Sequence, residues 1–191
     1  MSVKTTHTIN NTAYFITFTC FSWLPLFEIT KLYDDIYKGL DVIKKSGNSI
    51  LGYVIMHNHL HILIYQQQQN ITINAIIKEC KRFRAYEIVK RLEQMNMIRM
   101  LKKLESGIHA EQRNKGAKHK VFEESFDCKE CYSTKFIQQK LNYIHQNPVK
   151  AGLTIAAEEY LHSSAKYYLT GEQGIYPVTH YLNYYDVPIA R

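Results

Sequence analysis

Two histidines, His59 and His61, are separated by one residue within an aliphatic and β-branched segment that runs from residue 53 to residue 64. This composition favours an extended strand, in which alternate side chains share one face. The two imidazoles would then be roughly 7 Å apart at Cα, close enough to bind one cation. Taken alone, the motif is equally compatible with a pair of hydrogen-bonded histidines, so the rest of the chain must distinguish the two.

A second pair of polar residues, Tyr143 and Asn147, lies far downstream. Residues four apart share one helical face, so a hydroxyl nucleophile and an amide carbonyl could approach the same ion. With His59 and His61 this gives three ligands and leaves positions open for substrate oxygens, as catalytic metals require. The set suits Mg²⁺ or Mn²⁺ where a phosphate completes the coordination, and Zn²⁺ stays an alternative. By itself, Tyr143 would more simply be a residue of an amphipathic helix.

The charge of the chain points to a polyanionic partner. Its net charge is +7 and its pI is about 9.1, which favours nucleic acid. Fifteen tyrosines and eight phenylalanines offer flat surfaces on which bases could stack. Between Lys78 and Lys103, nine Lys or Arg residues stand against three Glu. This run is either a solvated helix face or a DNA-binding surface, and for the second case the candidates are Lys81, Arg82 and Arg84.

The hydrophobic pattern predicts the elements that must position these residues. Expected strands cover about 13–20, 50–56 and 59–65, and the last two could form one long strand. Thr30 is expected to cap a helix over about 31–46, and a long helix is expected over about 72–104. A further helix should begin at Ser133 or Thr134 and end near Gln146, because Pro148 disfavours helical geometry in the residue before it.

The whole chain, 1–191, is of a size for one domain, with a mobile basic loop near 105–120 and a C-terminal extension from about 156 that packs on it. No apolar run has the length of a signal peptide or of a membrane span. Four cysteines are too few for a disulfide framework, which predicts a reduced, cytoplasmic protein. Cys128 and Cys131 are expected to be structural, since a lone Cys-x-x-Cys lacks a second ligand pair for zinc.

In order along the chain, four motifs resemble the REP-associated tyrosine transposases, a family of the single-tyrosine HUH superfamily. They are the aromatic strand Tyr14–Phe18, the segment Met56–His61, the segment Tyr143–Leu153 and the pair Ser163-Ser164. The resemblance spans roughly residues 13–168. His57 stands where the family usually has proline, and His162 where a tryptophan often precedes the serines. The family's Gly-x-x-Trp-like segment is not evident near Lys118–Phe122.

The resemblance implies an α+β fold, a ferredoxin-like or RRM-like sandwich whose antiparallel sheet carries the histidines centrally under the tyrosine helix. It implies that Tyr143 attacks a phosphodiester of single-stranded DNA near a hairpin or palindrome, which forms a 5′-phosphotyrosine. His59, His61 and Asn147 would hold Mg²⁺ or Mn²⁺. Lys150 and His145 are candidate phosphate contacts, although helical geometry should turn His145 away from Tyr143. Homodimers are common among relatives and monomers are also expected, and the protein is expected to be associated with the nucleoid when it acts.

Two alternatives accompany this hypothesis. A host-adopted nuclease could cleave repeated palindromes without moving an element of its own. A non-catalytic domain could bind single-stranded DNA or RNA with the same fold, although binding alone does not require all four site residues. A metal-dependent barrel hydrolase with a His-x-His motif is excluded by the length of the chain and by the lack of further ligands in repeating βα units.

Overall fold

A four-stranded antiparallel sheet forms the centre of the molecule, in a computed structural model that describes residues 9–67, 71–114, 116–123 and 127–185. The strands follow the spatial order β2-β3-β1-β4, so β3 and β1 are the inner strands. Their bounds are Thr12–Thr19 for β1, Ser49–Ile55 for β2, His59–Gln66 for β3 and Asp127–Cys131 for β4.

The helices follow in chain order between and after the strands. The α-helices are α1 (Leu26–Ile29), α2 (Tyr33–Lys45), α3 (Ile73–Gln94), α4 (Ile98–Ser106), α5 (Ala110–Asn114), α6 (Thr134–Lys150) and α7 (Ala165–Thr170). Three short 3₁₀ turns are η1 (Phe21–Trp23), η2 (Ala157–Glu159) and η3 (Tyr181–Asn183). Among the described residues, none of the helices combines the length and the hydropathy that a membrane span requires.

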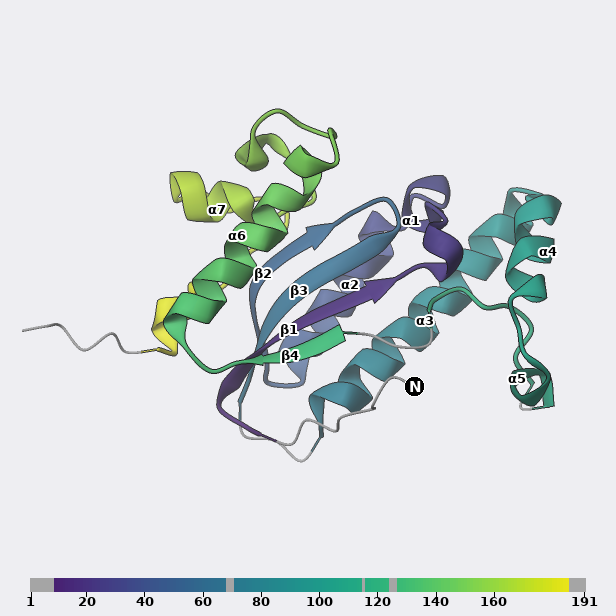
Figure 1. The fold of residues 1–191 in the computed structure, drawn as a ribbon, viewed down its shortest axis with the longest axis horizontal. Helices are drawn as coiled ribbons and strands as arrows, with labels where there is room; N and C mark the ends of the chain where they lie inside the picture. Colours follow the sequence, from purple (N-terminus) through teal and green to yellow (C-terminus); the bar gives the residue numbers. More distant parts are fainter. Residues whose placement is uncertain (1–8, 68–70, 115, 124–126, 186–191) are drawn as a thin grey trace, which may run out of the picture.

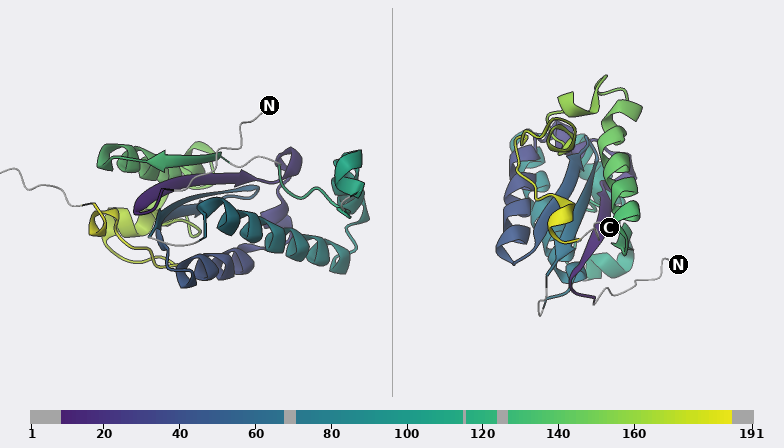
Figure 2. Two further views of the ribbon diagram at one scale, coloured as in Figure 1. Left: turned by 90° about the horizontal axis from the view of Figure 1, so that it is seen from below. Right: turned by 90° about the vertical axis from the view of Figure 1, so that its left-hand side faces the viewer.

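The sheet separates two helical layers. Helices α2 and α3 cover one face and α6 lies across the other, while α4 and α5 extend beyond one end of the sheet (Figures 1 and 2). One apolar cluster joins alternate strand residues such as Ile16 and Ile62 to α2 and α3. A second joins the opposite set, including Phe15 and Leu63, to α6. The expected α+β sandwich with inner-strand histidines is therefore confirmed.

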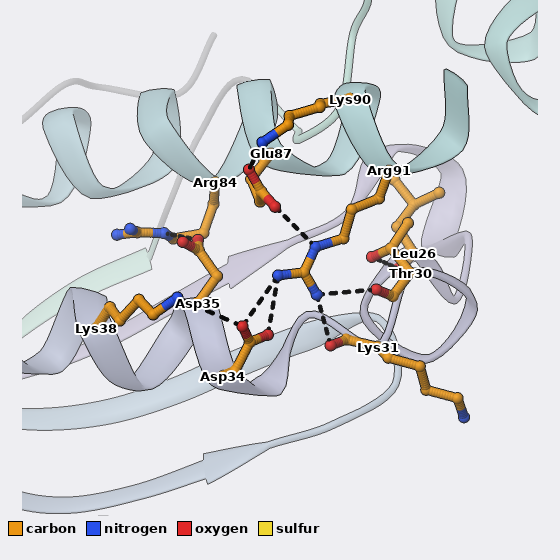
Figure 3. A network of polar contacts seen from close by, with 10 residues as sticks. All are labelled: Leu26, Thr30, Lys31, Asp34, Asp35, Lys38, Arg84, Glu87, Lys90 and Arg91. Carbon is orange, nitrogen blue, oxygen red and sulfur yellow. Dashed lines mark hydrogen bonds and ion pairs between the residues drawn. The ribbon is translucent and has the colours of Figure 1, made fainter. Parts of the chain in front are cut away.

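A network of ion pairs fastens α2 to α3 (Figure 3). Arg84 Nε lies 2.6 Å from Asp35 Oδ2, and both side chains are mostly buried. Arg91 reaches Asp34 and Glu87, and it also donates to the carbonyl oxygens of Thr30 and Lys31. A Cβ at Gly39 would lie 2.5 Å from Arg84 Nη1, so the glycine within α2 makes room for the guanidinium.

The C-terminal extension pairs with the outer edge of β2. Ile55 N–H donates to the carbonyl of His162 at 2.9 Å, and Ser164 N–H donates to that of Tyr53 at 3.0 Å. The Ser164 hydroxyl oxygen also accepts from Tyr53 N–H. Backbone groups that an edge strand would otherwise leave open are thus paired.

Some expected helix boundaries were wrong. The Thr30 hydroxyl donates to the carbonyl of Leu26 and so belongs to the end of α1, and it does not cap α2. The expected helix over 72–104 is broken, because Asn96 adopts φ 53° between α3 and α4. Strands β2 and β3 are separate and form a hairpin, so the single long strand is excluded.

Two further expectations need correction. Helix α6 continues through Pro148 to Lys150, and it ends where Leu153 N–H donates to the carbonyl of Pro148 and Gly152 adopts φ 69°. The loop near 105–120 contains helix α5. The sequence predicts no signal peptide at the N-terminus. This prediction concerns residues 1–8, which lie outside the described residues.

Candidate active site

Strand β3 directs both histidines toward α6. His61 lies opposite Thr17 on β1 and Val54 on β2, and His59 lies opposite Thr19. Leu60 and Ile62 point to the other layer and join the cluster with α2 and α3. The alternation read from the sequence therefore matches the structure, and both imidazoles are buried beneath the tyrosine helix.

Helix α6 is fixed against the sheet at its start and in its middle. The Ser133 hydroxyl oxygen accepts from Phe136 N–H at 3.2 Å, which is the expected N-cap. Farther along, Leu141 packs on β2 at Gly52, where a Cβ would lie 2.5 Å from Leu141 Cδ2. A glycine at this strand position therefore allows the close approach that brings the helix over the histidines.

This approach unites the four predicted site residues. Asn147 Nδ2 lies 3.1 Å from His61 Nε2. The Tyr143 ring meets the His61 ring edge-on, with centroids 5.0 Å apart, and 43% of Tyr143 is exposed. The His59 and His61 rings are 4.7 Å apart. A solvent-accessible phenol thus lies beside two imidazoles and an amide.

Hydrogen bonds to the far side of each ring fix the state of the imidazoles. Asn58 Nδ2 donates to the carbonyl of Trp23 at 3.0 Å, so its Oδ1 faces His59 Nδ1, 2.7 Å away. An amide oxygen only accepts, so His59 Nδ1 carries the proton and Nε2 keeps its lone pair. His61 Nδ1 lies 2.6 Å from Thr17 Oγ1, and its Nε2 accepts from the Asn147 amide. Both histidines therefore present Nε2 lone pairs toward α6.

Burial keeps these imidazoles neutral. Desolvation lowers the pKa of His59 below its ordinary value, although a hydrogen bond with Asn147 opposes the shift. Desolvation, with smaller effects of His59 and of the Lys140 charge, lowers the pKa of His61 to about 3. A neutral imidazole is the form that binds a metal ion.

The donor set fits a divalent cation. Two Nε2 lone pairs point to the same side, and each ring is oriented by a partner on its other nitrogen, as metal-binding histidines require. Turning the Asn147 amide by 180° would present Oδ1 in place of Nδ2. Within the described ranges no cluster of three His, Cys, Asp or Glu side chains could hold a metal ion, so any site here depends on the amide.

Sequence reasoning missed three residues of this site, Thr17, Asn58 and Lys140. Thr17 and Asn58 carry no signal of their own, because only strand pairing and the hairpin turn bring them to the histidines. Lys140 lies one helical turn before Tyr143, with Nζ 4.7 Å from the centre of the Phe15 ring. Because residues three apart share one helical face, the spacing of Lys140 and Tyr143 could have identified this lysine from the sequence.

The structure does not support the expected DNA-binding group on α3. Arg84 is buried against Asp35, so its predicted DNA contact is wrong. Lys81 Nζ donates to the carbonyl of Glu123 and lies over the Phe122 ring, and burial lowers its pKa to about 8. Arg82 is exposed and pairs with Glu79, but α3 covers the face of the sheet opposite α6. Its DNA contact stays a prediction.

The candidate phosphate contacts on α6 differ from each other. Lys150 is exposed at the end of the helix that carries Tyr143. His145 is buried, and its Nε2 lies 3.0 Å from the Ser164 hydroxyl, so its predicted phosphate contact is wrong. Desolvation lowers the pKa of His145 to about 4. His145 instead joins α6 to the C-terminal extension.

All four cysteines are free thiols. Cys128 and Cys131 lie on β4 and belong to the apolar clusters on opposite faces of the sheet. Side chains three apart on a strand point in opposite directions, so the pair cannot converge on one ion. This agrees with the expected structural role, although strand β4 itself was not predicted.

Comparison with known proteins supports the fold. No protein-family model and no curated protein matches the sequence. The structure is similar to that of a REP-associated tyrosine transposase bound to a REP hairpin, with a TM-score of 0.57 and 16% identity over 94% of this chain and 92% of the other. A proposed transposase from Deinococcus radiodurans R1 gives a TM-score of 0.43 and 13% identity over 75% of this chain and 95% of the other. The first similarity establishes a shared fold.

Proposed function

We propose that this protein is a transposase-like nuclease that cuts and rejoins single-stranded DNA near hairpins. The observation that carries the proposal is the meeting of Tyr143, His59, His61 and Asn147 at one place between β3 and α6. The solved structure of similar fold was determined with a REP hairpin, which supports this class of substrate. The host-adopted nuclease would use the same chemistry.

Tyr143 is the nucleophile in this proposal. Its hydroxyl oxygen attacks a DNA phosphorus atom, so the bond from oxygen to phosphorus forms and the bond from phosphorus to O3′ breaks. The phenolic proton passes to water, which reaches the half-exposed side chain, and the released O3′ takes a proton from water. The 5′-phosphotyrosine retains the energy of the phosphodiester. Attack by a 3′-hydroxyl therefore reverses the step and joins strands without ATP.

His59, His61 and Asn147 would hold Mg²⁺ or Mn²⁺, with Zn²⁺ as the alternative. A bound cation would neutralise charge on the scissile phosphate as the phenol approaches. Thr17 and Asn58 keep the two imidazole rings oriented. Lys140, beside Phe15, and Lys150 would contribute positive charge along the path of the strand.

The test is covalent capture of DNA. The protein is incubated with a pool of labelled hairpins carrying single-stranded flanks and with Mn²⁺, and the products are separated on a denaturing gel. We expect a protein–DNA band in the wild type that disappears with EDTA and in Tyr143→Phe. Tyr86→Phe is the matched control, because Tyr86 is also an exposed helical tyrosine but lies on α3, in the opposite layer.

Two results would contradict the proposal. An adduct formed equally by Tyr143→Phe would exclude this residue as the nucleophile. If the wild type binds the hairpin tightly but forms no adduct with Mg²⁺, Mn²⁺ or Zn²⁺, the non-catalytic binding domain is favoured instead.

A further inference from the structure

The single tryptophan of the chain, Trp23, stands exposed beside the candidate metal site. Its side chain is 63% exposed although it is a large apolar residue. The ring centroids of Trp23 and His59 are 5.6 Å apart at an interplanar angle of 72°. An indole face is thus available to a ligand next to one of the two imidazoles.

The backbone that carries this indole adopts an unfavourable conformation. Ser22 and Trp23 have φ values of 53° and 56°, a region that bulky L-residues rarely occupy. Ser22 N–H donates to Glu123 Oε1 at 2.8 Å, and the next amide, Trp23 N–H, donates to the carbonyl of Cys20 at 3.1 Å. These hydrogen bonds hold the turn so that the indole points outward. Because the ring is exposed, its burial does not explain the unfavourable backbone conformation.

One side chain couples the indole to the candidate metal site. Asn58 donates to the carbonyl of Trp23 through Nδ2 and accepts from His59 through Oδ1. A ligand resting on the indole would therefore sit at a fixed position relative to His59. Charges of both signs flank this turn, because Lys120 Nζ lies 5.1 Å from the centre of the Phe21 ring and the Glu123 carboxylate accepts from Ser22 N–H.

We propose that Trp23 is a stacking platform for an unpaired DNA base next to the scissile phosphate. This inference rests on the proposed function and names how that site would position its substrate. A base suits the site because it presents a flat π-face to the indole while its own phosphate can reach the adjacent cation site. Stacking is tolerant of sequence, so Trp23 would fix the position of the strand more than its identity.

Intrinsic fluorescence tests the contact directly, because no other residue is a tryptophan. The Tyr143→Phe protein, with Mg²⁺, is titrated with hairpin oligonucleotides and excited where tyrosine does not absorb. We expect quenching on binding of a hairpin with a single-stranded flank. A set of oligonucleotides with one abasic site each should lose this quenching at one position of the flank, which identifies the stacked base.

Affinity measurements provide the second test. Trp23→Ala should weaken binding of the single-stranded flank about tenfold, which lies within the range that stacking of one base contributes. Trp23→Phe should retain most of the affinity, because it keeps an aromatic face. Tyr86→Ala, which removes an equally exposed ring from α3, should bind as the wild type does. Far-UV circular dichroism checks that each variant is folded.

The outcomes separate this inference from the proposed function. Suppose that the wild type forms the Tyr143 adduct, that DNA binding does not change its tryptophan fluorescence, and that Trp23→Ala binds DNA with the affinity of the wild type. The stacking proposal is then overturned, and the proposed function stands. Quenching that no single abasic site removes would also overturn it. Position-specific quenching without an adduct would support the stacking contact and contradict the cleavage chemistry.

Discussion

Two polar networks lie on opposite faces of the same sheet, and they differ in how their groups are satisfied. Between α2 and α3, the guanidinium groups of Arg84 and Arg91 are paired with carboxylates and carbonyl oxygens of the chain itself (Figure 3). Beneath α6, two neutral imidazoles lie side by side, and one of them accepts from the Asn147 amide and meets the ring of the exposed Tyr143 edge-on. The first network consists of charged pairs, whereas the second consists of neutral histidines and an amide beside a tyrosine that solvent reaches.

The comparison shows why charge in a sequence does not locate a binding surface. Arg82 and Arg84 stand two residues apart on α3, yet one faces solvent and the other is buried against Asp35. The residues of the proposed site are two histidines, a tyrosine and an asparagine, and a count of Lys and Arg finds none of them. Changes in the two networks should therefore have separable effects, on catalysis in one and on folding in the other.

The largest effect is expected from His61→Ala, which removes one of the proposed metal ligands beneath α6. Adduct formation in Mg²⁺ or Mn²⁺ should fall by a factor of about 1,000 or more, about 4 kcal/mol in activation free energy. Hairpin affinity should change much less. Gel quantification of the adduct measures the first and fluorescence titration the second. Full activity in both His61→Ala and His59→Ala would refute the ligand assignment.

Arg84→Met should act on folding instead. It leaves the mostly buried Asp35 carboxylate without its partner, so the free energy of unfolding should fall by about 3 kcal/mol. Urea denaturation followed by circular dichroism measures the change. Arg82→Met is the matched control and should shift stability by at most about 0.5 kcal/mol, because its pair with Glu79 is exposed. Equal effects of the two substitutions would contradict the distinction between them.

Acid should weaken the α6 side of the sheet through His145. Its pKa is about 4 in the folded protein and about 6.5 in an unfolded chain, so between these values the unfolded state binds more protons. Its contribution to stability is therefore complete above about pH 6.5 and is lost as the pH falls toward 4, by about 2 kcal/mol at pH 5. Urea unfolding of the wild type and of His145→Gln from pH 7.5 to 5 measures it. A Gln variant as acid-sensitive as the wild type would argue against this origin.

The smallest effect is expected from Thr17→Val, which removes the oxygen that orients His61 Nδ1. Loss of such a partner to a ligating histidine should weaken metal affinity about tenfold, about 1.4 kcal/mol. Activity titrated against Mn²⁺ concentration should show a higher requirement with the same maximum. An unchanged requirement would mean that the strand alone positions the ring.

Much of the site could be read from sequence because strand and helix periods act over a few residues. Alternation placed His59 and His61 on one face, and the spacing of four placed Tyr143 and Asn147 together. The same local reasoning gave the strands β1, β2 and β3 and the Ser133 cap. This local reasoning failed at Thr30, Asn96 and Pro148. At these positions the local signals compete with tertiary packing and with the hydrogen bonding of the helix ends.

The tertiary structure decided everything that depends on pairing distant segments. Strand pairing brings Thr17 to His61, and a hairpin turn lets Asn58 fix both His59 and the Trp23 carbonyl. The packing of α3 on α2 turned Arg84 from a candidate DNA contact into a buried ion pair. Side-chain periodicity is set by backbone geometry within one element, and so the sequence determines it. Burial, tautomer and partner are set by contacts between elements, which only the folded chain defines.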